Sequence, residues 1–79
     1  MELTKSELIT KVLQYAYNVT LEKFTDDLKT VIDSPFVSYQ YAEEKFDRMR
    51  GNFITFYCDL DDEAKERFVQ VALKHYGLA

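Results

Sequence analysis

The chain has 79 residues, of which 47% are hydrophobic and 30% are charged, so one domain spanning residues 1–79 is expected. With only two glycines and one proline, the composition excludes a disordered tail, a collagen-like repeat and a flexible linker. The net charge of −4 is opposite in sign to that of a general nucleic-acid binder. A single cysteine excludes an intramolecular disulfide. Because the chain also lacks a signal-like start and any apolar run long enough for a bilayer, we expect a cytoplasmic protein with no membrane association.

The first predicted helix begins at a capping box, in which the side chains of Thr4 and Glu7 each satisfy a free backbone N–H of the first turn. Two sets of apolar residues follow at helical spacing. The first set is Leu8, Val12, Tyr15, Ala16 and Val19, and the second is Ile9, Leu13 and Tyr17. Together the two sets cover roughly 200° of the helix surface, which is wider than the apolar stripe of a surface helix. We therefore expect this helix to lie centrally or to be buried on two sides.

A second helix is predicted to follow Thr20, whose hydroxyl is a favourable N-cap. Its apolar residues form one narrow stripe, and charged residues occupy the other side. The stripe is Leu21, Phe24, Leu28, Val31 and Ile32, and the charged side is Glu22, Lys23, Asp26, Asp27 and Lys29. Because no glycine or proline separates the first two helices, the sequence leaves open whether they are distinct or joined by a kink.

A third helix is predicted to start at Ser34 and Pro35, a serine cap followed by proline at the first helical position, and to stop at a left-handed Gly51. The alternation of apolar and polar residues over 37–41 also suits a strand, but the strong helix formers over 42–50 favour a helix. One face of this helix is expected to carry Tyr39, Ala42, Phe46, Met49 and Phe53.

Residues 52–58 are ambiguous, because their β-branched and aromatic content suits a strand, whereas apolar spacings of three and four continue through them. Helix is favoured, since a lone strand would have no partner. The last helix has acidic residues at its start, Lys74 and His75 at its end, a Glu63–Arg67 pair and Gly77 as its stop. Its apolar residues again spread widely. The predicted fold is an all-α bundle of about four helices.

The residues that could form catalytic or metal sites are better explained by structural roles. The segment 59–63 resembles the opening of a calcium loop, but Ala64 and Gln70 stand where glycine and glutamate are required. Cys58 lies in an apolar run and His75 at a helix C-terminus, so we expect a buried thiol and a capping imidazole rather than a nucleophile and its base. The sequence therefore predicts a non-enzymatic protein without cofactor or metal.

Nucleic-acid binding is the weaker alternative function. The densest basic cluster, Lys45, Arg48 and Arg50, is interleaved with acidic residues and would release few counterions from a phosphate backbone. Those acidic residues are Glu43, Glu44 and Asp47. Contact with nucleic acid is thus not expected, although a nucleic-acid-associated co-regulator remains the alternative class.

Surplus aromatic residues favour a protein–protein surface. Six tyrosines and six phenylalanines exceed what one small core readily absorbs. Because a spacing of two sends side chains to nearly opposite sides of a helix, one tyrosine of each close pair should leave the core. The predicted interaction surface comprises Tyr15, Tyr17, Tyr39, Tyr41, Leu73 and Tyr76. A homodimer that buries the first helix, the last helix or both would account for their breadth, and the partner protein is not identified by the sequence.

The segment Leu3-Thr4-Lys5-Ser6-Glu7, followed by Thr20-Leu21-Glu22, resembles the opening of the small helical nucleoid-associated co-regulators of the Hha/YmoA type. The likeness covers about the first quarter of the chain. It implies a small helical protein that acts by binding a larger nucleoid protein. It implies no functional residue, and past Asp33 the apolar pattern departs from that of the family.

Overall fold

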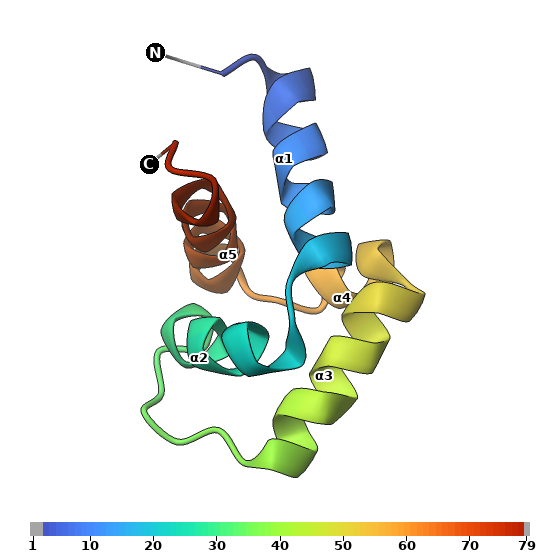
Figure 1. Cartoon of the computed structure of the whole chain (residues 1–79), viewed down its shortest axis with the longest axis vertical. Helices are drawn as coiled ribbons and strands as arrows, with labels where there is room; N and C mark the ends of the chain where they lie inside the picture. The colour runs from blue at the N-terminus through green and yellow to red at the C-terminus, as the bar shows by residue number, and fades with distance from the viewer. Residues whose placement is uncertain (1–2, 79) are drawn as a thin grey trace.

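The computed structural model describes residues 3–78, and that range contains five helices and no strand (Figure 1). They are α1 (Lys5–Asn18), α2 (Leu21–Val31), α3 (Tyr39–Gly51), α4 (Phe53–Cys58) and α5 (Asp62–His75). The predicted all-α class is confirmed, and the ambiguous segment 52–58 is helical. No helix in the described range is long and apolar enough to cross a lipid bilayer.

The first two helices are distinct. Val19 has extended backbone angles (φ −69°, ψ 142°), as does Thr20 (φ −79°, ψ 159°), so the helical hydrogen-bond ladder stops between α1 and α2. The Thr20 hydroxyl accepts a hydrogen bond from the backbone N–H of Lys23 at 3.2 Å, which confirms the predicted cap. A turn without glycine or proline is therefore made by one threonine whose side chain replaces a missing backbone partner.

Only one of the two hydrogen bonds of the predicted capping box forms at the start of α1. Thr4 Oγ1 accepts a hydrogen bond from the backbone N–H of Glu7 at 3.2 Å, as expected. The Glu7 carboxylate, however, accepts from the Thr4 hydroxyl at 3.0 Å. Glu7 thus orients the capping side chain, and the reciprocal bond to the Thr4 backbone is not among those formed.

The predicted start of the third helix at Ser34 and Pro35 is wrong, because α3 begins four residues later with Ser38 as its N-cap. The α2 helix ends in a left-handed Asp33 (φ 54°), and the N–H of Ser34 donates back to the carbonyl of Lys29. The Ser34 hydroxyl then accepts from the N–H of Phe36, so it closes a local turn and caps no helix.

The predicted left-handed stop at Gly51 is also wrong. Gly51 is the last residue of α3, and among the described residues Gly77 is the glycine with positive φ (72°). Asn52 separates α3 from α4 instead, because its extended backbone (φ −148°) breaks the ladder while its side chain accepts from the N–H of Thr55 at 3.1 Å. Gly77 does end α5 as predicted, with the N–H of Leu78 bonded to the carbonyl of Leu73.

The core lies where α5 packs against both α1 and α2, with α3 on the other side of α2 (Figure 1). Phe68 of α5 is fully buried at its centre. Four rings surround it, with centroid distances of 5.6 Å to Tyr15, 5.7 Å to Phe56, 6.0 Å to Phe53 and 6.2 Å to Tyr57. Two other helices, α1 and α4, thus place aromatic rings around one side chain of α5.

Candidate functional site

The residues predicted to form an interaction surface do not gather on one face. Tyr15 is fully buried in the core, whereas Tyr17 is exposed on the opposite side of α1. Tyr39 and Tyr41 are both exposed at the start of α3, well apart from the end of α5 (Figure 1). The remaining two, Leu73 and Tyr76, are half-buried at that end of α5.

The second apolar set of α1 is the largest departure from the expected burial. Within the chain only the first set packs into the core, and Ile9 and Tyr17 of the second set remain 50% and 56% exposed. Leu13 between them is half-buried. We define the outer face of α1 as the residues on the side of the helix that carries Ile9, Leu13 and Tyr17, which are Ser6, Ile9, Thr10, Leu13, Gln14 and Tyr17. The outer face of α1 therefore carries no charge over about three turns, although 30% of the residues in the chain are charged.

The widely spread apolar residues of α5, in contrast, pack against other parts of the same chain. Val69 and Tyr76 pack against the core, and the Lys11 ammonium of α1 lies 5.0 Å from the centroid of the Tyr76 ring. Tyr76 is thus held by the packing of its own ring against the core and by the attraction of that ring to the Lys11 ammonium. Of the two broad helices, α1 is the one that leaves its second apolar set largely uncovered.

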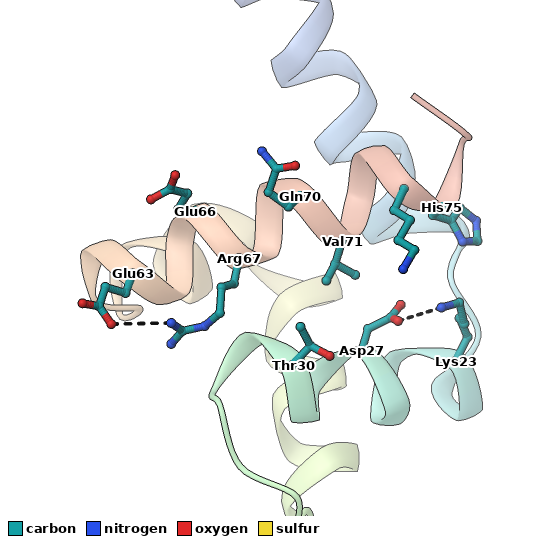
Figure 2. Close-up of a pocket in the computed structure, with 10 residues that line it drawn as sticks. Lys23, Asp27, Thr30, Glu63, Glu66, Arg67, Gln70, Val71 and His75 are labelled. Carbon is teal, nitrogen blue, oxygen red and sulfur yellow. Dashed lines mark hydrogen bonds and ion pairs between the residues drawn. The ribbon is translucent and has the colours of Figure 1, made fainter. Parts of the chain in front are cut away.

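A groove of about 890 Å³ runs between α2 and α5 (Figure 2). Its walls carry charges of both signs. The lining residues are Lys23, Asp27 and Thr30 of α2 and Glu63, Glu66, Arg67, Gln70, Val71, Lys74 and His75 of α5. Glu63 and Glu66 lie toward one end of the groove, and Lys23 and His75 lie toward the other (Figure 2).

Asp27 is a polar residue whose burial the sequence pattern did not predict. It was expected on the solvent side of its helix, but it is only 8% exposed. Its carboxylate accepts a 2.6 Å hydrogen bond from the hydroxyl of buried Tyr15 and a 2.7 Å bond from the Lys23 ammonium. Burial, the hydrogen bond to Asp27 and the negative charge of that residue raise the pKa of Tyr15 far above its ordinary value of 10.0. The sequence did hold a signal for this burial. Asp27 lies three residues after Phe24 and directly before Leu28, so helical spacing places it at the edge of the apolar stripe of α2.

Alkaline pH should therefore destabilise the fold through Tyr15. Below pH 10 the folded and unfolded states both keep the phenol proton, and this contribution to stability is fully present. Above pH 10 only the unfolded state loses the proton, because the folded-state pKa is raised. The free energy of unfolding should then fall by about 1.4 kcal/mol per pH unit from this group. Urea titrations followed by circular dichroism at pH 8 to 11 measure it.

Tyr15→Phe should remove this part of the pH dependence, since phenylalanine has no proton to lose. Tyr41→Phe is the matched control and should leave the dependence unchanged, because Tyr41 is exposed at the start of α3 and lies outside both the core and the outer face of α1. Parallel curves for the wild type and Tyr15→Phe would contradict the assignment.

A second charged side chain of the groove, Arg67, also connects α5 to α2. Arg67 of α5 donates from Nε to the carbonyl of Val31 at 2.9 Å, which satisfies a free acceptor at the end of α2. Its Nη1 lies 3.5 Å from the Glu63 carboxylate, and this confirms the predicted pair. The His75 ring packs edge-on against Tyr15, with 5.4 Å between ring centroids. The groove is thus a charged seam that joins α2 to α5.

The candidate catalytic pair is not brought together. Cys58 ends α4 and is exposed, so the expectation of a buried thiol is wrong. It precedes the first turn of α5, whereas His75 is in the last turn, about 20 Å away along the helix axis. Among the described residues, no group of three or more histidine, cysteine, aspartate or glutamate side chains is placed to hold a metal ion.

The basic cluster at the end of α3 makes contacts within the chain. Arg48 forms a 2.7 Å ion pair with Asp59, and Arg50 donates to the carbonyl of Tyr17 at 3.0 Å. The Lys45 ammonium lies 5.4 Å from the centroid of the Tyr41 ring. Arg48 and Arg50 thus fix α3 to neighbouring parts of the fold, a use that competes with contact to phosphate.

No protein-family model matches this sequence, and no curated protein or solved structure is significantly similar to it. The resemblance of the first quarter of the chain to nucleoid-associated co-regulators therefore stays a prediction.

Proposed function

We propose that this chain is a non-enzymatic protein that acts through protein–protein contacts and forms a homodimer through the outer face of α1. The supporting observation is the uncharged row of exposed Ile9, half-buried Leu13 and exposed Tyr17 on a helix whose other side fills the core. Depletion of charge and enrichment of tyrosine are typical of interface centres. A chain of this length buries only roughly 60–65% of its unfolded surface, so association is a common source of added stability.

The proposal assigns Tyr39 and Tyr41 no part in the homodimer. They lie at the start of α3, outside the outer face of α1, and are left for contact with a partner protein. A cytoplasmic location belongs to the same proposal and rests on the composition, with its single, exposed cysteine. The basic cluster favours no second candidate, because Arg48 and Arg50 already bond within the chain.

Light scattering behind a sizing column, over a range of protein concentrations, tests the homodimer. The expected mass is twice the 9.3 kDa of one chain. The double variant Ile9→Ser/Tyr17→Ser should shift the mass toward one chain, because it removes the apolar anchors of the contact. Phe36→Ser is the matched control, since Phe36 is 87% exposed but lies outside this face. A wild-type mass of one chain at every concentration would refute the homodimer.

A further inference from the structure

We infer that the outer face of α1 pairs with the same face of a second copy in an antiparallel arrangement, with the two-fold axis at Leu13. Ile9 of each copy then packs against Tyr17 of the other. This inference rests on the proposed function, because it takes the homodimer as given and specifies its geometry.

The spacing of the apolar row makes the outer face self-complementary. Leu13 lies four residues after Ile9 and four before Tyr17, so a two-fold axis through Leu13 and perpendicular to α1 exchanges the other two positions. Such a contact is isologous, with the same patch used by both copies, and it closes as a dimer. Rows spaced by four residues interdigitate at a crossing angle of about 50°, a common class of helix packing.

Charge favours a second copy as the occupant of this face. The outer face of α1 carries no charged residue, so two such faces meet without burying an ion. A charged peptide would instead place its ionic groups against side chains that offer no opposite charge. The uncharged side chains of Thr10 and Gln14 flank the row and supply hydrogen-bonding groups at its edge.

The surroundings of α1 favour the antiparallel over the parallel direction. The hydrogen bond from Arg50 to the carbonyl of Tyr17 places the end of α3 beside the end of α1 (Figure 1). A parallel pair would bring both copies of this bulky, basic end together. An antiparallel pair separates them and opposes the two helix dipoles.

Charge substitution at the two exchanged positions tests the geometry. Ile9→Lys and Tyr17→Glu are each expected to raise the dimer dissociation constant at least tenfold, measured by sedimentation and light scattering. In an antiparallel pair, position 9 of one copy meets position 17 of the other. An equimolar mixture of the two variants, and the double variant Ile9→Lys/Tyr17→Glu, should therefore associate at least fivefold more tightly than either single variant. Ile54→Lys and Phe36→Glu are matched controls at exposed positions elsewhere, and should leave the constant unchanged.

The outcomes separate this inference from the proposed function. A dimeric wild type that single substitutions weaken, without recovery in the mixture, overturns the antiparallel geometry and leaves the homodimer intact. A dimeric wild type that neither single substitution weakens places the interface elsewhere and overturns the inference. A monomeric wild type overturns the homodimer itself. Circular dichroism of each variant checks that the fold is retained.

Discussion

Replacing Phe68 with alanine is expected to lower the free energy of unfolding by about 3–5 kcal/mol. The side chain is 1% exposed, and its ring contacts aromatic rings from α1 and α4 at once. Alanine would leave a cavity where these helices meet α5, and the loss would approach the whole stability of a domain of this size, roughly 4–12 kcal/mol. Urea and thermal unfolding followed by circular dichroism measure the change.

Two further variants keep that prediction testable if Phe68→Ala does not fold. Phe68→Leu retains most of the volume and should be folded but clearly destabilised. Phe36→Ala removes an 87% exposed ring and should change stability by no more than about 0.5 kcal/mol. Equal effects of Phe68→Ala and Phe36→Ala would show that the aromatic cluster is not the centre of the core.

The hydrogen bond between Tyr15 and Asp27 should give the second large effect. Asp27→Ala leaves a buried phenol without its acceptor, and Tyr15→Phe leaves a carboxylate that is 8% exposed without its hydroxyl donor. Each change is expected to cost about 1–3 kcal/mol. The double variant should cost less than the sum, with a coupling energy of about 1 kcal/mol or more, because it removes both polar groups together.

A double-mutant cycle measured by urea unfolding gives this coupling energy directly. Lys23→Met is the control, since its ammonium also bonds Asp27 but its side chain is half exposed and screened by water. It should cost no more than about 1 kcal/mol. Strict additivity of the Tyr15 and Asp27 changes would mean that the buried bond contributes nothing.

Local patterns predicted the helices better than the places where they end. Thr20 and Gly77 were predicted correctly because neither has a strong competitor nearby. Ser34 failed because a second serine, Ser38, was equally able to cap, and the left-handed end of α2 had already used Ser34 in a turn. The choice between two adequate caps depends on how the flanking helices pack, which periodicity does not contain.

The candidate interface was likewise predicted only in part from local patterns. The spacing of Tyr15 and Tyr17 predicts that one ring leaves the core, and the structure confirms it. Tyr39 and Tyr41, at the same spacing, are both exposed, because the start of α3 extends beyond the helices that could cover it. The positions of the neighbouring helices decide which apolar set of a broad helix stays uncovered. The main neighbour of α1 is α5, which covers only one side of it.

The meeting of α1 and α4 at Phe68 of α5 bears on the order of events during synthesis. Residues 5–31 form α1 and α2, but neither helix has its main packing partner until α5 exists. While the chain emerges from the ribosome, Tyr15 and Phe24 therefore remain without the cluster that buries them. Isolated helices of this length are only marginally stable in water, so the early segments should stay fluctuating until residue 68 is released. Folding is thus expected to be a late, concerted event that follows translation of α5.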